Sequence, residues 1–355
     1  MNARQAKQTV KEWVKANIES WPGIRGAHLV GGVTTMPDEA TFPDYKDIDL
    51  HLIFEEGSPA LQPADPFMNI LEIPYKGLML EGGLKSLREY QSVKVVLSNP
   101  EIAHHFTVDS LLYDPSGWLR HLQQQVKREF PRRQWVLARC EHERNGLKKA
   151  LEMLPLARGI VGGEVLTLGY TTTFISSLLS VATLQSPTTG SRVLIRLREI
   201  LTRYDRLDLY ERFLAILGVE NMSPERVAQL LQEGIEAFDL AVQIRRTPHP
   251  AQHKLHPHLR PYFVNSCQRL LDEGYYGEAG HWLALFHLSS IGVIMVDGPD
   301  GEKPRFAERS RRFLKDLGMD TAAASAARFE QANGLYVEFF ALARDIISRH
   351  PGIVD

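Results

Sequence analysis

His28-Leu29-Val30-Gly31-Gly32 and Asp47-Ile48-Asp49-Leu50-His51-Leu52-Ile53-Phe54 are the two stretches of the chain from which a fold can be predicted. In the second stretch apolar residues alternate with polar ones, as in a β-strand, whose successive side chains point to opposite faces. The apolar face would carry Ile48, Leu50, Leu52 and Phe54, and the other face Asp47, Asp49 and His51. The alternation therefore predicts a strand with one buried face and one acidic face.

Two carboxylates on one face of a strand are neighbours, and both stay charged only if something positive lies between them. A divalent metal that carries a phosphate group is the usual solution, and ligands that are all oxygen atoms favour Mg²⁺. The Gly31-Gly32 pair just upstream has no Cβ atoms, so its backbone can come close to that phosphate. The two stretches together predict a site for a metal and a phosphate.

This combination resembles the nucleotidyltransferase superfamily, which includes the aminoglycoside nucleotidyltransferases and the polymerase β-like enzymes. The family pattern is an apolar residue, Gly, Gly or Ser, a spacer, Asp-apolar-Asp-apolar, and a third acid on a neighbouring strand. Here it reads Val30-Gly31-Gly32 and then Asp47-Ile48-Asp49-Leu50. Two departures stand out: Gly32 replaces the Ser of many members, and the spacer from Val33 to Lys46 is long for the family.

The third acid of the family pattern is best matched by Glu81. It lies in the second strand of a predicted hairpin formed by Ile70–Tyr75 and Leu78–Glu81. Glu72 also lies on a predicted strand of that hairpin, so it remains an alternative.

The resemblance implies a role for each residue of the pattern. The catalytic and metal-binding residues would be Asp47, Asp49 and Glu81, holding two Mg²⁺ ions that bridge a triphosphate, and the nucleotide-binding residues would be Gly31, Gly32 and Lys46. Lys85 and Arg88 are further candidates for contact with the triphosphate. The reaction would be an in-line displacement at the α-phosphorus with pyrophosphate leaving, catalysed mainly by positioning and charge neutralisation.

Helices are predicted over residues 3–21 and 86–97, and over 100–106 with Asn99 as the cap. The character of the chain changes at Asp114-Pro115-Ser116-Gly117, beyond which one predicted helix follows another. Among these are a helix over 164–184 and one that starts with Ser223 as the cap and Pro224 in its first turn. We therefore expect an α+β protein in which residues 1–116 form a nucleotidyltransferase domain, a small mixed β-sheet with helices. Residues 117–355 would form an all-helical domain that serves the acceptor or dimerisation. The resemblance implies the same order of domains, as in the aminoglycoside-modifying branch of the family.

Composition sets the frame for this prediction. The chain has 355 residues, 44% hydrophobic and 24% charged, which is ordinary for a soluble globular protein. Its net charge of −2 argues against a dedicated nucleic-acid binder. Cys140 and Cys267 lie far apart, the first residues do not form a signal peptide, and a cytoplasmic location is expected. The uncharged stretch from Val165 to Ser191 favours a buried helix over a membrane span.

Three other features of the sequence carry weaker functional hypotheses. The histidines His249, His253, His256 and His258 have spacings that can bind Zn²⁺, but a loop is the simpler interpretation. A basic run, Lys127, Arg128, Arg132, Arg133 and Arg139, is best explained as a solvated helical face. The acids and aromatics of Leu271–Trp282 suit an acceptor pocket, although a packed helical hairpin is favoured.

The sequence therefore predicts a metal-dependent enzyme that moves a nucleoside monophosphate, by resemblance AMP from ATP, to a hydroxyl of a small acceptor such as an aminoglycoside. Two alternatives remain open: an enzyme that adenylylates a partner protein, as in toxin–antitoxin pairs, and a non-catalytic nucleotide-binding regulator. The expected partners are a nucleoside triphosphate and a small acceptor, without a membrane and without nucleic acid. A homodimer is a further hypothesis, because the resemblance implies that subunits pair to complete the site, as in many members of the family.

Overall fold

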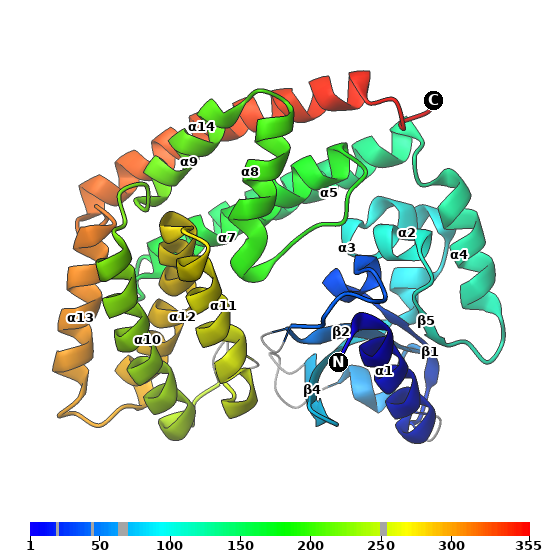
Figure 1. Ribbon diagram of the computed structural model, residues 1–355, viewed down its shortest axis with the longest axis horizontal. Coiled ribbons are helices and arrows are strands. Elements are labelled where there is room, and N and C mark those ends of the chain that lie inside the picture. The colour runs from blue at the N-terminus through cyan, green and yellow to red at the C-terminus, as the bar shows by residue number, and fades with distance from the viewer. Residues whose placement is uncertain (19–20, 44–45, 63–69, 249–253) are drawn as a thin grey trace. The chain divides into compact units, whose positions relative to one another are not determined.

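The computed structural model describes residues 1–18, 21–43, 46–62, 70–248 and 254–355. The chain forms two compact units. The first comprises Met1–His142, Val181–Pro187 and Ile347–Asp355, and the second comprises Glu143–Ser180 and Thr188–Ile346 (Figure 1). The domain boundary at residues 116 and 117 stays a prediction of the sequence.

The first unit is built on a five-stranded sheet with the strand order β3-β4-β2-β1-β5. The strands are β1 (Ile24–Leu29), β2 (Ile48–Phe54), β3 (Ile70–Tyr75), β4 (Leu78–Ser86) and β5 (Leu111–Tyr113). The sheet is mixed, because β2 pairs in parallel with β4 while β1/β2, β1/β5 and β3/β4 are antiparallel. A small mixed sheet followed by helices confirms the predicted α+β fold class.

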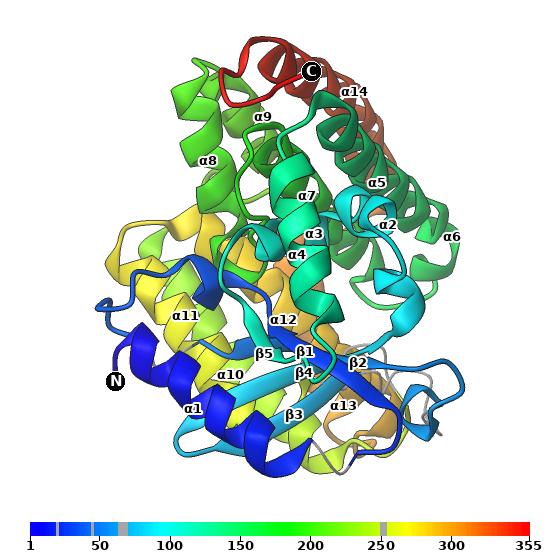
Figure 2. The same cartoon turned by 90° about the vertical axis from the view of Figure 1, so that its right-hand side faces the viewer.

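One face of the sheet is covered by α1 (Ala3–Asn17), as Figure 2 shows. This helix starts with a capping box in which the side chains of Asn2 and Gln5 each accept the other's backbone N–H. Its apolar stripe packs on Ile48, Leu50, Leu52 and Phe54 of β2, which confirms the predicted apolar face. The prediction of a single buried face is wrong further along the strand, because His51 and Ile53 on the opposite face are buried as well. The helix ends at Asn17, earlier than the predicted Trp21, with Ile18 as its C-cap.

The other face packs against short helices that follow the sheet: η3 (Leu87–Tyr90), α2 (Val93–Ser98), α3 (Pro100–Ala103), η4 (His104–Thr107) and α4 (Trp118–Glu129). A single helix over 86–97 was predicted, and that prediction is wrong, because the segment is divided into η3 (Leu87–Tyr90) and α2, which starts at Val93. β4 continues to Ser86, and the Ser92 side chain accepts the Val95 N–H to begin α2. Asn99 caps α3 as predicted.

The second unit is helical. Its helices, three of which extend into the first unit, are α5 (Arg133–Glu152), α6 (Leu154–Ala157), α7 (Gly163–Ala182), α8 (Val193–Arg203), α9 (Leu207–Leu217), α10 (Pro224–Ile244), α11 (Arg260–Asp272), α12 (Tyr276–Asp297), α13 (Lys303–Asp316) and α14 (Ala322–Arg349). Ser223 caps α10 and Pro224 occupies its first turn, as the sequence predicts. The helix predicted at 164–184 is α7.

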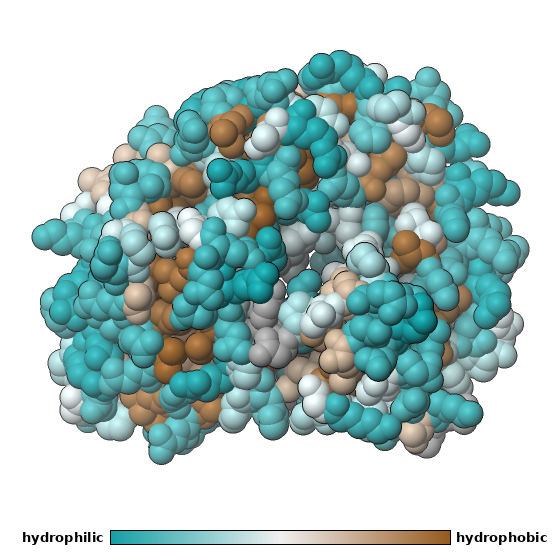
Figure 3. Space-filling view, in the orientation of Figure 1, coloured by the Kyte–Doolittle hydropathy of each residue, from teal (hydrophilic) through white to brown (hydrophobic). Residues whose placement is uncertain are grey.

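Two of these helices, α7 and α12, are long and apolar enough to cross a membrane by length and composition alone. Within their most apolar windows, 78% of α7 and 72% of α12 are buried inside the protein, as in core helices. The face of the molecule in Figure 3 is mainly hydrophilic, with apolar side chains gathered over α10 and its neighbours. The burial of α7 agrees with the predicted buried helix.

Candidate metal and nucleotide site

Three carboxylates come together at the start of β2. Asp47 precedes the strand, Asp49 is its second residue, and Glu81 on β4 is the residue paired with Asp49 in the parallel register. One carboxylate oxygen from each of the three lies within 4.8 Å of the other two, and all three residues are half-buried. The structure thus brings together the three acids that the sequence singled out.

The donor set of this cluster fits a hard divalent cation. It offers only carboxylate oxygens, which Mg²⁺ and Ca²⁺ prefer. Two oxygens on opposite sides of one Mg²⁺ are about 4.2 Å apart, and those around Ca²⁺ reach about 5 Å. A separation of up to 4.8 Å therefore allows Ca²⁺ directly and Mg²⁺ after small side-chain rotations.

The glycine turn lies directly against this cluster. Gly31 has φ 66° and ψ −167°, a conformation open only to glycine, and a Cβ atom there would overlap the Asp49 carboxylate. A Cβ atom on Gly32 would lie 3.3 Å from Lys46 Nζ. A carboxylate thus lies beside Gly31 and an ammonium group beside Gly32.

The other candidate cations are engaged elsewhere. Lys85 Nζ lies 3.5 Å from Glu89 and 3.7 Å from Glu101, and Arg88 pairs with Glu56 at 2.9 Å. Among the three cations that the sequence offered for a triphosphate, Lys46 is the one whose ammonium group lies beside the glycine turn in the described residues.

Glu72, the alternative third acid, lies on β3 directly opposite Glu81. Paired residues of neighbouring strands point to the same face, so Glu72, Glu81 and Asp49 form a row across three strands. The cluster of converging oxygens contains Glu81 and not Glu72. The register therefore selects Glu81 as the third member.

Behind the carboxylates lies a buried hydrogen-bonded chain that the sequence did not reveal. The Tyr90 hydroxyl lies 2.8 Å from His28 Nε2 and 2.7 Å from His51 Nδ1. His28 Nδ1 lies 3.0 Å from the Leu29 carbonyl, which can only accept, so His28 carries its proton on Nδ1. Tyr90 then donates to His28 Nε2 and accepts from His51 Nδ1–H.

These groups are neutral because they are buried. Burial lowers the pKa of His28 to about 4, and it holds the pKa of His51 well below the usual range. Burial also raises the pKa of Tyr90 well above its ordinary value. His51 follows Asp49 by two positions on the acidic face, and that spacing was the one signal in the sequence for this chain of contacts.

The weaker candidates have mixed outcomes. His256 and His258 stack with ring centroids 4.7 Å apart, whereas His249 and His253 lie outside the described residues. Among the described residues, the acidic cluster is the one group of three or more potential metal ligands.

The solvated helical face predicted for the basic run is wrong for Arg139, which is only 1% exposed. Its guanidinium donates to the carbonyls of Leu97 and Phe130 and lies 4.1 Å from the Phe130 ring centroid. Arg139 thus satisfies carbonyls left over where α2 and α4 end.

Two surface cavities lie in the helical unit. One, of about 310 Å³, is lined by Tyr275, Tyr276 and Glu278 of the Leu271–Trp282 stretch, and the Tyr210 hydroxyl donates to Glu278 there.

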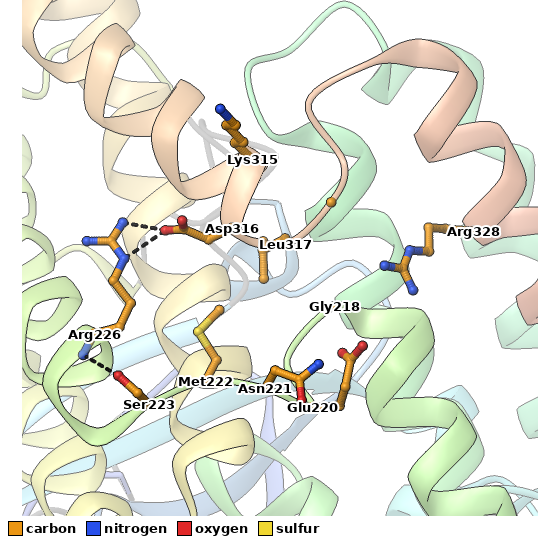
Figure 4. Close-up of a pocket in the computed structure, with 11 residues that line it drawn as sticks. Gly218, Glu220, Asn221, Met222, Ser223, Arg226, Lys315, Asp316, Leu317 and Arg328 are labelled. Carbon is orange, nitrogen blue, oxygen red and sulfur yellow. Dashed lines mark hydrogen bonds and ion pairs between the residues drawn. The ribbon is translucent and has the colours of Figure 1, made fainter.

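The other cavity, of about 320 Å³, lies where α9 and α13 end (Figure 4). Its cations serve the helices, because Arg226 pairs with Asp316 and Arg328 donates to the Ala215 carbonyl. Arg328 thus satisfies a carbonyl in the last turn of α9.

The geometry thus defines a candidate carboxylate metal site beside a glycine turn, on a small mixed sheet. No family model matches the chain, and no curated protein matches it. The chain is similar to the crystal structure of a nucleotidyltransferase-like protein from Exiguobacterium sibiricum 255-15, with 14% identity over 86% of this chain and 91% of that chain. The TM-score of 0.28 is too low to establish a shared fold.

Proposed function

We propose that this protein is a divalent-metal-dependent nucleotidyltransferase that moves a nucleoside monophosphate from a nucleoside triphosphate to a hydroxyl of a small acceptor. The observation that carries the proposal is the convergence of Asp47, Asp49 and Glu81 against the Gly31 backbone. ATP is the first triphosphate to test and an aminoglycoside the first acceptor. Both come from the resemblance of the sequence pattern.

The proposed transfer exchanges one phosphoester bond for another. The acceptor oxygen forms a bond to the α-phosphorus while the bond from that phosphorus to the bridging oxygen breaks, and pyrophosphate leaves. The hydroxyl proton passes to a carboxylate of the site or to solvent. A bound divalent cation would neutralise the triphosphate and stabilise the attacking and leaving oxygens.

The residues of this chain supply binding and orientation for that reaction. The three carboxylates would hold the cation, and the Gly31–Gly32 backbone would let the phosphates approach without a Cβ clash. Lys46 supplies a positive charge at the same turn, which favours a triphosphate over an uncharged ligand. Protein adenylylation uses the same groups, and a regulator that only binds nucleotide needs the same ligands. The acceptor screen separates these alternatives.

The test is a thermal-shift titration of the wild type and of the Asp47→Asn/Asp49→Asn double variant with ATP, GTP, CTP and UTP, with and without Mg²⁺. A ligand at one hundred times its dissociation constant stabilises the fold by about 2.7 kcal/mol, which raises the melting temperature measurably. The proposal expects one triphosphate to stabilise the wild type only with Mg²⁺, and the double variant to lose that response. Equal responses of both proteins, or none, would contradict it.

Turnover is tested separately, by pyrophosphate release with each stabilising triphosphate and a panel of hydroxylated acceptors. Release that depends on an acceptor supports the transferase. A wild type that binds the nucleotide with Mg²⁺ yet releases no pyrophosphate with small acceptors or with protein from a lysate would favour the regulator.

A further inference from the structure

The Gly31 peptide groups are held by a closed ring of three hydrogen bonds. The Gly31 N–H donates to His105 Nε2 at 3.3 Å, His105 Nδ1 lies 3.0 Å from Thr34 Oγ1, and the Thr34 hydroxyl donates to the Gly31 carbonyl at 2.8 Å. The ring therefore fixes both the N–H and the C=O of Gly31. The two side chains that form it, His105 and Thr34, are buried.

The direction of each hydrogen bond in the ring follows from which of its groups carry a proton to donate. A carbonyl oxygen only accepts, so the single hydroxyl proton of Thr34 goes to Gly31. His105 Nδ1 must then be the donor to Thr34, which leaves the lone pair of Nε2 to accept the Gly31 N–H. Burial lowers the pKa of His105 well below the usual range, in keeping with this neutral tautomer.

His105 is itself anchored to the sheet. Its carbonyl accepts the Ser110 hydroxyl at 2.6 Å, and the Ser110 carbonyl accepts the Leu29 N–H of β1 at 2.8 Å. The imidazole is only 4% exposed. The ring thus connects the glycine turn to a fixed point of the fold, so that the position of the turn depends on His105.

The position of Gly31 in turn limits the position of Asp49. The Asp49 carboxylate packs so closely on Gly31 that a Cβ atom there would overlap it, and the Val30 N–H donates to the Asp49 carbonyl at 2.9 Å. A shift of the Gly31 peptide therefore removes one of the contacts that limit the position of that carboxylate.

From these contacts we infer that His105 is a positioning residue for the carboxylate site, which acts through Gly31 to hold the Asp49 side chain where a divalent cation binds. The inference rests on the proposed metal-dependent function and adds a residue that none of the sequence patterns contains.

The two contacts of the His105 imidazole, with Gly31 and with Thr34, can be removed one at a time by two substitutions of His105. In His105→Gln the side-chain carbonyl reaches the place of Nε2 and can accept the Gly31 N–H. In His105→Asn the amide reaches only the place of Nδ1, so the Thr34 contact is kept and the acceptor for Gly31 is lost. Thr34→Val keeps the shape of the side chain but removes its hydroxyl, and with it the hydrogen bonds to the Gly31 carbonyl and to His105 Nδ1.

His104→Asn is the matched control, because His104 is the neighbouring imidazole, with its ring centroid 5.8 Å from that of His105.

The measurement is the Mn²⁺ dissociation constant by electron paramagnetic resonance, with the melting temperature of each metal-free protein. We expect His105→Asn and Thr34→Val to bind Mn²⁺ about 10-fold more weakly, and His105→Gln and His104→Asn to bind it like the wild type. If His105→Asn does not fold, Thr34→Val against the wild type decides.

Two outcomes overturn the inference, and they are distinguishable. If the wild type binds Mn²⁺ and His105→Asn binds it as tightly as His105→Gln, or both variants lose affinity equally, then His105 only supports the fold and the metal site stands. If the wild type binds no Mn²⁺, the proposed metal-dependent function fails, and the role of His105 fails with it.

Discussion

Asp49 on β2 and Glu81 on β4 lie directly opposite each other on neighbouring parallel strands. Paired residues in a sheet share a face, so the register brings these two carboxylates together. One oxygen of each also lies within 4.8 Å of an Asp47 carboxylate oxygen. Two like charges in such a pair are unfavourable unless a cation compensates them. The pairing is therefore the structural basis for expecting a divalent cation.

Glu81 and Glu72 oppose each other on β4 and β3, which makes them a matched pair for substitution. We expect Glu81→Gln to weaken Mn²⁺ binding by about 10-fold or more, because it removes one of the three converging oxygens. Glu72→Gln should bind Mn²⁺ nearly as well as the wild type. Isothermal titration calorimetry with Mn²⁺ measures both, and a larger loss for Glu72→Gln would show that the wrong glutamate has been assigned to the site.

Gly31→Ala should abolish Mn²⁺ binding, because the new Cβ atom would overlap the Asp49 carboxylate. It should also destabilise the fold, since φ at Gly31 is positive. Gly57→Ala is the control: φ is 80° there, and nothing lies within 4 Å of a Cβ atom. We expect Gly57→Ala to cost about 1–2 kcal/mol in unfolding free energy and to leave Mn²⁺ binding unchanged. Chemical denaturation and calorimetry test both variants, and intact Mn²⁺ affinity in Gly31→Ala would refute the packing argument.

Acid should destabilise the helical unit through His281. Burial lowers the pKa of His281 to about 4, whereas an unfolded chain titrates its histidines near 6.5. Between these values the unfolded chain binds more protons, so the stabilisation is complete above pH 6.5 and is lost as the pH falls towards 4. From pH 7 to pH 5 this residue alone accounts for about 2 kcal/mol.

His281→Gln should reduce that loss between pH 7 and pH 5. The Gln amide can still donate to Thr172 Oγ1, which lies 3.2 Å from His281 Nε2. Unfolding by urea at the two pH values is the measurement, and His121→Gln, at an exposed position, is the control. An unchanged difference in His281→Gln would show that His281 does not contribute to the acid response.

Arg139→Met should destabilise the protein by about 2–4 kcal/mol, because the carbonyls of Leu97 and Phe130 lose their buried donor. Arg128→Met removes a guanidinium whose side chain is 74% exposed, and we expect less than about 0.5 kcal/mol for it. Urea denaturation at pH 7 compares the two. Equal small effects would indicate that water satisfies both carbonyls after the substitution.

Short-range signals account for what could be predicted about the elements. The alternation of Ile48–Phe54 gave the correct faces of β2, and Asn99 and Ser223 cap helices as expected. Such signals work because a strand period or a cap is decided within a few residues. The same locality explains why the predicted strand Leu78–Glu81 was too short, since its pairing with β2 extends β4 to Ser86.

The sequence by itself determined the acidic face of β2, the glycine turn and the change from sheet to helices. Only the tertiary structure decided that Glu81 stands opposite Asp49, that His105 closes a ring on Gly31 across 74 positions of sequence, and that Arg139 is buried. The physical reason is that strand register and long-range contacts are set by which apolar faces pack together and which backbone groups pair. The alternation of a strand sequence predicts the face of the sheet on which a side chain lies. The residue that lies beside it on the next strand depends on how the whole unit packs.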